Sequence, residues 1–532
     1  MTFTELRLAG FKPFGDLQTL RLAPLTLVYG PNSSGKSSII QSLLLTKQSL
    51  EGSPRLAELV PRGDFTDLGS FAALVHRHRV AKPFTVGFSY TGARIAAPAM
   101  SPYPKSGRAQ PSKVHIDLTY GLERGKGRKA VHPAELQRVR YELHGASEHA
   151  FRVRLVRRKR EASSDAEHES IATFTPADQT SYDELAKAAF ERLERVIRPG
   201  RQQSLFGDSS ADDDEEEFLY PEDQKRALDA TIQAGLSKLG FNVEGGLPSR
   251  ATLADEGVLG GMGRRASSNV PKLDASMSRV VWDELSGSLS QSLGGICQAT
   301  RERLRLMTYL GPLRSSPQRY YDMNGAEVFH VGTQGEHTPQ VLQMRGRQLK
   351  DNVNQWFKRF DIPYTLAMRT VGDKVIGALV SMTLRDLRTK VEVSPSDVGF
   401  GIGQLLPVMV QGLLSRAELI CVEQPEIHLH PRLQAELAEF FIETSGIRKG
   451  EGEVTGKQWL IETHSEALIR RLQRRIREGV VNREDVSVLY VEPGSRGSRV
   501  LELRIDDDGS FIDPWPGGFF DERFDDIFGG AP

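Results

Sequence analysis

The chain is poor in cysteine: among 532 residues only Cys297 and Cys421 are cysteines. Two cysteines cannot form a disulfide framework or a cysteine-rich zinc site, and this scarcity favours a reducing compartment. No stretch approaches the roughly 20 consecutive apolar residues that cross a bilayer. The first residues also lack an apolar core of signal-peptide length. We therefore expect a cytoplasmic protein that has no membrane partner.

The chain also lacks net charge, because its 69 Lys and Arg residues balance 69 Asp and Glu residues. This balance excludes a general attraction to nucleic acid, so any such contact must come from a local patch. Two basic segments, residues 151–160 and 467–479, can contact DNA phosphates. The alternative is that they form solvated faces or pair with the acidic run at 212–217.

A phosphate-binding loop is present near the start of the chain. The stretch GPNSSGKSS fits G-x-x-x-x-G-K-[ST], lies after the apolar strand-like run at 24–29 and precedes a helical pattern. Backbone N–H groups of such a loop surround phosphates, its lysine reaches the β- and γ-phosphates, and the hydroxyl of Ser37 is placed to bind Mg²⁺. The expected ATP-binding residues are Gly30, Pro31, Asn32, Ser33, Ser34, Gly35, Lys36, Ser37 and Ser38.

Two later strand ends carry the polar residues that ATP hydrolysis needs. The apolar run LICV ends in Glu423, which we predict to be a Mg²⁺ ligand together with Ser37, and Gln424 and Glu426 follow. About 40 residues further on, the apolar run WLI leads to His464, which can hydrogen-bond a γ-phosphate or the attacking water. The alternative for each segment is a strand followed by an ordinary polar turn.

A glycine-rich turn supplies a second candidate anion site. Gly399, Gly401 and Gly403 precede an apolar helix that we expect to start near Gln404. Helix N-termini bind anions, and the loop at residues 30–38 already serves the chain's own nucleotide. The glycine turn is therefore predicted to contact the γ-phosphate held by a partner subunit. The alternative is that the turn needs glycines for steric reasons only.

The predicted fold class is α/β, with mixed and parallel sheet and flanking helices, in which a nucleotide-binding head is divided by an insertion. Residues 1–80 would form the first part of the head and 301–532 the second. Residues 81–300 show β-type alternation and then helical and Gly/Ser-rich segments, so we expect an inserted α+β region. No sustained heptad pattern predicts a coiled-coil arm.

Together the segments GPNSSGKS, GFGIGQ, LICVEQPEIHLHP and LIETHSE resemble the ABC-type P-loop ATPase heads of the SMC, RecF and OLD-like group. More closely they resemble bacterial AAA-family ATPases with E-Q-P-E-x-H-L-H-P and E-T-H-S boxes, which share an aromatic ending like the one at 510–528. The resemblance implies an ATP- and Mg²⁺-dependent homodimer or higher homo-oligomer. It places Glu423 as the metal-binding acid, His464 as the switch histidine, and Gly401, Gly403 and Gln404 in the signature loop.

Two departures from this pattern bear on the mechanism. Gly401 stands where a serine is usual, and Gln424 stands where the catalytic glutamate is usual. An amide can orient water but cannot accept its proton, so either Glu426 accepts it or hydrolysis is slow.

The resemblance also suggests a biological role. Such ATPases regulate a separate nuclease or toxin in anti-phage complexes, and we see no nuclease site in this chain. The alternatives are a RecF-like DNA-repair ATPase and an ATP-dependent scaffold with little turnover.

Overall fold

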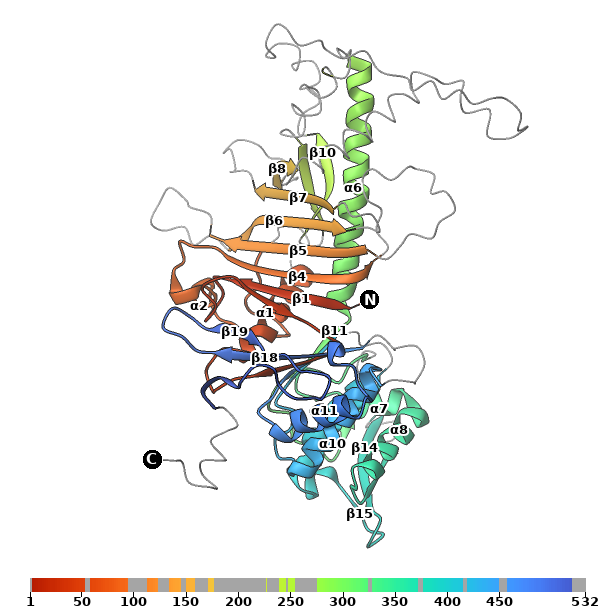
Figure 1. Ribbon diagram of the computed structural model, residues 1–532. Helices are drawn as coiled ribbons and strands as arrows, with labels where there is room; N and C mark the ends of the chain where they lie inside the picture. Colours follow the sequence, from red (N-terminus) through yellow and green to blue (C-terminus); the bar gives the residue numbers. More distant parts are fainter. Residues whose placement is uncertain are drawn as a thin grey trace, which may run out of the picture. The chain divides into compact units, whose positions relative to one another are not determined.

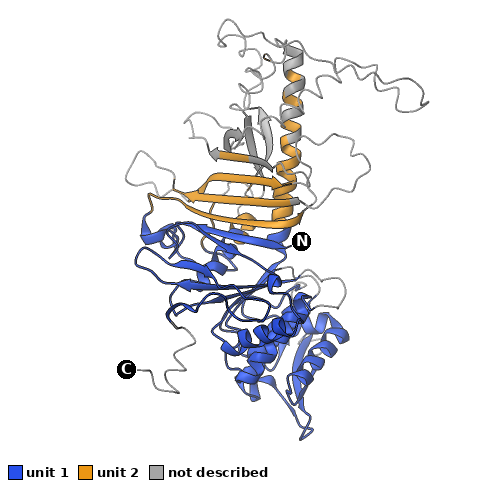
Figure 2. Cartoon of the chain, viewed as in Figure 1, with its two compact units in different colours: residues 1–46, 62–79, 302–532 blue, residues 47–61, 80–301 orange. Residues whose placement is uncertain are grey.

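The protein is described from a computed structural model of the full chain. It describes residues 2–52, 58–93, 112–122, 134–144, 150–157, 171–176, 226, 239–244, 247–253, 275–323, 328–371, 377–414, 419–448 and 457–518. The chain divides into two compact units (Figure 2). Unit 1 comprises residues 1–46, 62–79 and 302–532, and unit 2 comprises residues 47–61 and 80–301.

Unit 1 is built on a six-stranded sheet of order β11-β16-β17-β3-β18-β19. The first five strands are parallel and β19 is antiparallel to β18. The central strands are continuous apolar runs, as expected for strands buried on both faces. The strands are β3 (Leu25–Tyr29), β11 (Met307–Leu310), β16 (Leu419–Glu423), β17 (Gln458–Glu462), β18 (Val486–Glu492) and β19 (Arg499–Glu502).

Helices α9 (Phe400–Leu413) and α10 (Pro431–Ser445) pack against strands of this sheet. Further helices (Figure 1) are α1 (Lys36–Gly52), α2 (Phe71–Leu74), α7 (Thr338–Met344), α8 (Gly346–Arg359) and α11 (Glu466–Arg477). Trp459 on β17 is fully buried, and its ring centroid lies 4.7 Å from that of Phe441 and 6.2 Å from that of Phe440 on α10. This aromatic cluster fixes α10 against the strand that leads into the predicted switch region.

Two smaller β elements complete unit 1. Strands β1 (Phe3–Ala9) and β2 (Gln18–Arg21) form an antiparallel pair ahead of the phosphate-binding loop. Strands β12 (Tyr321–Asp322), β13 (Tyr364–Val371), β14 (Leu379–Asp386) and β15 (Glu392–Val393) form a second antiparallel sheet. The 3₁₀ turns are η1 (His76–His78), η4 (Pro395–Asp397), η5 (Arg483–Asp485) and η6 (Pro516–Gly518).

Unit 2 contains the antiparallel strands expected from the alternating pattern. They are β4 (Phe84–Ala93), β5 (Ser112–Gly121), β6 (Glu135–His144) and β7 (Ala150–Arg157). Beyond this expectation, β8 (Ile171–Pro176) pairs with β7, and β9 (Leu239–Glu244) and β10 (Leu247–Leu253) form a separate pair. The hydroxyl of Tyr90 forms a 2.9 Å hydrogen bond with the hydroxyl of Thr300 on the long helix α6 (Ala275–Arg305). The sequence did not predict this helix. Tyr141 also meets α6, 3.5 Å from Cys297 Sγ.

Two features named from the sequence, the acidic run at 212–217 and a helical pattern at 181–197, lie outside the described residues. Among the helices that the structure describes, none is both long and apolar enough to cross a lipid bilayer.

Candidate nucleotide-binding site

The predicted phosphate loop and acidic residues meet at one edge of the six-stranded sheet. Strands β16 and β17 are parallel and in register, so that Glu423 lies beside Glu462, and Glu462 lies beside Val28 on β3. The loop at residues 30–38 leaves β3 at this same edge and enters α1 at Lys36. Polar groups at the carboxyl ends of parallel strands form the usual ligand site of such sheets.

The loop has the backbone conformation that its glycines predict. Gly30 and Gly35 have φ angles of 143° and 106°, and Ser33 is also left-handed at 62°. A Cβ atom at Gly35 would lie 2.4 Å from Pro13 Cγ, so only glycine fits there. Lys36 Nζ donates hydrogen bonds to the carbonyl oxygens of Gly30, at 3.0 Å, and Pro31, at 2.9 Å. The ammonium group therefore points into the concave side of the loop.

Two carboxylates, Glu423 and Glu462, lie within hydrogen-bonding reach of the Ser37 hydroxyl, which can donate its single proton to one of them at a time. Burial, reinforced by the charge of Glu462, raises the pKa of Glu423 to about 7. Burial also raises the pKa of Glu462, whose Oε2 atom is buried without a hydrogen-bond partner. Tyr309 donates a 2.9 Å hydrogen bond to Glu423 Oε1. A hydroxyl and two buried carboxylates that repel one another fit a Mg²⁺ ion, whose charge would stabilise both anions.

The predicted switch histidine lies beside Glu426. Glu426 Oε1 accepts a 2.7 Å hydrogen bond from the backbone N–H of His464, and burial raises the pKa of this carboxyl group. Burial, together with the charge of Lys36, lowers the pKa of His464. The imidazole is therefore neutral near pH 7 and can donate one hydrogen bond to a phosphate or a water molecule.

Gln424 occupies a strained turn that a buried arginine holds in place. Its φ angle is 45°, and its N–H donates to the carbonyl oxygen of Glu462 at 2.7 Å. Arg314, which is 5% exposed, donates to the carbonyl oxygens of Glu423 at 2.7 Å and Gln424 at 3.1 Å. Burial lowers the pKa of Arg314 to about 10, so the guanidinium stays charged at neutral pH.

Sequence reasoning assigned no role to Arg314, Tyr309 or Glu462. Glu462 had a visible signal, because it ends an apolar strand in the same way as Glu423. Arg314 and Tyr309 had none, because their partners lie about 110 residues away in the sequence.

The glycine turn differs from its prediction in one respect. Helix α9 begins at Phe400 rather than near Gln404, so Gly401 and Gly403 lie within its first turn. A Cβ atom at Gly401 would lie 2.9 Å from the carbonyl oxygen of His428, which supports a steric reason for that glycine. The buried side chain of Gln404 exchanges hydrogen bonds of 3.3 and 3.4 Å with the backbone of Arg314.

Gly399 has neither a steric nor a conformational reason to be glycine. It is exposed, its φ of −55° suits any residue, and no atom lies within 4 Å of the place that a Cβ would take. Because it precedes the first N–H groups of α9, its small size leaves that helix end open to a group from outside the chain.

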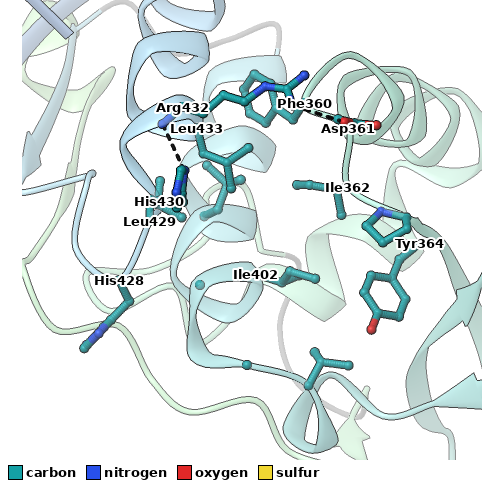
Figure 3. Close-up of a pocket in the computed structure, with 15 residues that line it drawn as sticks. Phe360, Asp361, Ile362, Tyr364, Ile402, His428, Leu429, His430, Arg432 and Leu433 are labelled. Carbon is teal, nitrogen blue, oxygen red and sulfur yellow. Dashed lines mark hydrogen bonds and ion pairs between the residues drawn. The ribbon is translucent and has the colours of Figure 1, made fainter. Parts of the chain in front are cut away.

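A groove of about 420 Å³ opens beside this turn. Its lining includes Gly399, Gly401, Ile402, Tyr364, Leu429, His430 and Leu433. In Figure 3 the side chains of Leu429, His430 and Leu433 lie together, apart from those of Ile402 and Tyr364. His430 caps α10 by accepting a 3.3 Å hydrogen bond from the N–H of Arg432. In Figure 3 the side chains of His428 and His430 point in different directions.

Three segments of the chain match family models. Residues 5–57 match an AAA domain, and residues 283–470 match a model described as "AAA domain, putative AbiEii toxin, Type IV TA system". The first match contains the phosphate loop, and the second contains Glu423, Glu426 and His464. The chain has a P-loop ATPase fold. Residues 481–528 match a third model, a "Protein of unknown function (DUF3696)".

Solved structures similar to the chain include SMC head domains. One, from Pyrococcus furiosus, carries an extended coiled coil and is bound to the C-terminal domain of ScpA; it has 12% identity and a TM-score of 0.35, with 94% of this chain and 96% of that one covered. The SMC head domain from Thermotoga maritima has 10% identity and a TM-score of 0.34, with 95% and 100% covered. No curated protein matches the chain.

Several arginines on α11 are paired with glutamates. Glu439 on α10 lies 3.0 Å from Arg471 and 2.7 Å from Arg475, and Arg474 lies 2.7 Å from Glu478. This favours the ion-pair alternative for residues 467–479 over DNA contact, although the partners differ from the acidic run named as an alternative. For the other basic segment, Arg158, Lys159 and Arg160 lie outside the described residues.

The segment around Trp515 packs onto the strand that leads into the phosphate loop. The ring centroid of Trp515 lies 5.4 Å from that of Tyr29, the last residue of β3 before the phosphate loop. Tyr29 is fully buried and donates a 2.9 Å hydrogen bond to the carbonyl oxygen of Ser465, next to His464. Phe519 and Phe520 lie outside the described residues.

Proposed function

We propose that the protein binds and hydrolyses ATP as a dimer that closes around two nucleotides. The observation that carries this proposal is the meeting of the Ser37 hydroxyl with Glu423 and Glu462 beside the phosphate loop. Residues 30–38 would bind the phosphates, with Lys36 on the β- and γ-phosphates, while Ser37 and Glu423 hold Mg²⁺. The metal ion would supply charge neutralisation to the transferred phosphoryl group.

The remaining residues of the site position the attacking water. Glu426 and Tyr29 hold the backbone of His464 and Ser465, which places the neutral imidazole of His464 beside the phosphate loop for a hydrogen bond to a γ-phosphate. Gln424 can orient a water molecule through its side-chain amide, and the buried Glu426 is the candidate acceptor for its proton. Burial raises the pKa of Glu426, which makes this carboxylate a stronger base than an exposed one.

The assignment of the base can be tested with two exchanges. Glu426→Gln is expected to reduce turnover by roughly 100-fold, the lower end of the range for general acid–base catalysis, while ATP binding persists. Gln424→Glu is expected to raise turnover, because it restores a carboxylate on the turn after β16. Steady-state phosphate release and nucleotide binding are measured for both. Unchanged turnover in Glu426→Gln would exclude Glu426 as the base.

Dimer closure would bring the N-terminus of α9 onto the nucleotide of the partner subunit. The open helix end at Gly399 supports this, because intramolecular packing gives no reason for a glycine there. Gly401 and Gly403 would then maintain the packing of the first turn, and Gln404 would hold Arg314, rather than each reaching a phosphate.

Substitution of Gly399 tests this closure. Gly399→Glu is expected to abolish ATP-dependent dimerisation, because its carboxylate would face the partner's γ-phosphate, whereas a glutamate at a helix N-terminus does not destabilise the monomer. Gly399→Ala is the matched control and should still dimerise. Light scattering in the presence of ATP measures the dimer, with each Gly399 variant combined with Glu426→Gln so that hydrolysis is slow. Lys36→Ala should remain monomeric in the same measurement. Dimerisation of Gly399→Glu equal to that of the control would refute closure through this turn.

We further propose that the dimer is the sensing and regulatory subunit of an anti-phage complex in which a separate nuclease or toxin is the effector. The match at 283–470 supports this, because its description names a toxin of a toxin–antitoxin system. Co-expression with the products of neighbouring reading frames, followed by a toxicity assay with and without Lys36→Ala, tests it. Toxicity that is unchanged by Lys36→Ala would contradict control of the effector by nucleotide.

A second function, an ATP-dependent scaffold with little turnover, is favoured by Gln424 alone. It predicts ATP binding and dimerisation as above, but no phosphate release from the unmodified protein.

A further inference from the structure

Three side chains of metal-ligand type meet on the sheet of unit 2, away from the nucleotide-binding residues in the sequence. His115 lies on β5, and Glu142 and His144 lie on β6. The register places His115 directly opposite Glu142. Residues 142 and 144 share a face of β6 because side chains alternate along a strand. One ligand atom from each of the three residues lies within 4.8 Å of the others.

The surrounding contacts orient these ligands. The fully buried hydroxyl of Ser89 on β4 lies 2.7 Å from His115 Nδ1, which leaves the Nε2 atom of that ring directed away from the hydroxyl. Metal-bound histidines are commonly held in this way by a hydrogen bond to the other ring nitrogen. Arg140 pairs with Oε1 of Glu142, and it would partly neutralise this ligand.

His144 gives an independent indication of a missing partner. Its Nε2 atom is buried and has no hydrogen-bond partner, although it lies 3.5 Å from Glu142 Oε2. The ring centroids of His115 and His144 are 4.9 Å apart. A buried ring nitrogen without a partner costs free energy, and a cation that it coordinates would remove this cost.

The ligand types select the metal. Two imidazoles and one carboxylate suit Zn²⁺, whereas Mg²⁺ and Ca²⁺ prefer oxygen ligands throughout. In a tetrahedral zinc site the ligand atoms are roughly 3.3 Å apart, so the present spacing of 3.5 to 4.8 Å requires small side-chain rotations only. We propose that His115, Glu142 and His144 bind one Zn²⁺ ion per chain, with water as the fourth ligand.

Such an ion would cross-link β5 and β6 and thereby stabilise unit 2. A ligand that binds only the folded state raises its stability in proportion to the logarithm of the free ligand concentration over Kd. Zn²⁺ should therefore raise the melting temperature of the full-length protein by a few degrees after chelator treatment.

Calorimetric titration of the chelator-treated full chain with Zn²⁺, and the visible absorption of Co²⁺ in its place, test the proposal. We expect one tight Zn²⁺ site per chain, and the Glu423→Gln variant should retain it. His115→Asn and His144→Asn should each weaken binding by at least about tenfold, in line with the loss of a ligand. His337→Asn is the matched control, because His337 lies 3.9 Å from a single glutamate, Glu336, in unit 1.

Three outcomes would overturn the proposal: Zn²⁺ binding retained in the His115→Asn, His144→Asn double variant, binding lost in Glu423→Gln, or no tight site. Far-UV circular dichroism of each variant checks that the sheet persists. A folded double variant that has lost the Co²⁺ absorption band would confirm the site.

Discussion

Glu423→Gln is expected to reduce ATP turnover by roughly 100-fold or more, since a preorganised charge at the reacting phosphate contributes on that scale. Glu423 is 6% exposed and shares the Ser37 hydroxyl with Glu462, so an amide at this position would remove one anionic ligand from the metal ion. Phosphate release at saturating ATP measures the effect, and the apparent affinity for Mg²⁺ should fall in the same variant.

The same substitution should change how the stability of the protein depends on pH when neither Mg²⁺ nor nucleotide is present. The pKa of Glu423 is raised from 4.5 to about 7 in the folded protein, so the folded state holds this proton more tightly than the unfolded chain does. The free energy of unfolding therefore falls as pH rises from about 4.5 to 7, and it levels off at higher pH. Glu423 contributes about 3 kcal/mol to this fall. Glu423→Gln lacks this loss and should be the more stable protein at pH 8.

Glu502→Gln serves as the matched control. Glu502 is an exposed carboxylate that lies 2.6 Å from Arg21, so its loss should leave turnover and the pH profile unchanged. Turnover in Glu423→Gln equal to that of the control would contradict the metal-binding role of Glu423.

Arg314→Met is expected to destabilise unit 1 by about 3 kcal/mol, because it leaves the buried carbonyl oxygens of Glu423 and Gln424 without their charged donor. Turnover should fall as well, since the left-handed conformation of Gln424 is then less firmly held. Chemical denaturation measures the first effect and phosphate release the second.

A comparison with two other variants separates positioning from general stability. Arg319→Met removes an exposed arginine that lies 2.7 Å from Asp397, and it should cost less than about 1 kcal/mol. Arg314→Lys keeps the charge but reaches fewer acceptors, so its stability and turnover should lie between those of Arg314→Met and the unmodified protein. Full stability of Arg314→Met would show that other groups hold the turn.

The features that the sequence predicted correctly each depend on residues within one short segment. The phosphate loop is a contiguous motif between an apolar strand and a helix, and the acids at 423 and 426 follow an apolar run directly. The α/β fold follows from several such runs, because strands without polar alternation need cover on both faces. The first turn of α9 was misplaced because glycines favour turns in general, whereas here packing against Pro317 and the His428 carbonyl requires them within the helix.

The contacts that sequence reasoning missed depend on pairing between distant segments. Arg314 follows a short strand and resembles any other loop arginine until β11 is placed beside β16. The same applies to His115 and Glu142, which become neighbours only through the register of β5 and β6. A shift of that register by one residue would place the two side chains on opposite faces.

The contact between Trp515 and Tyr29 has a further consequence. The indole of Trp515 packs against Tyr29, which immediately precedes Gly30. The segment around Trp515 therefore supports the phosphate loop through the end of β3. The indole is only partly buried, whereas Trp282 and Trp459 are fully buried. We therefore expect nucleotide binding, if it moves the end of β3, to change the emission of Trp515.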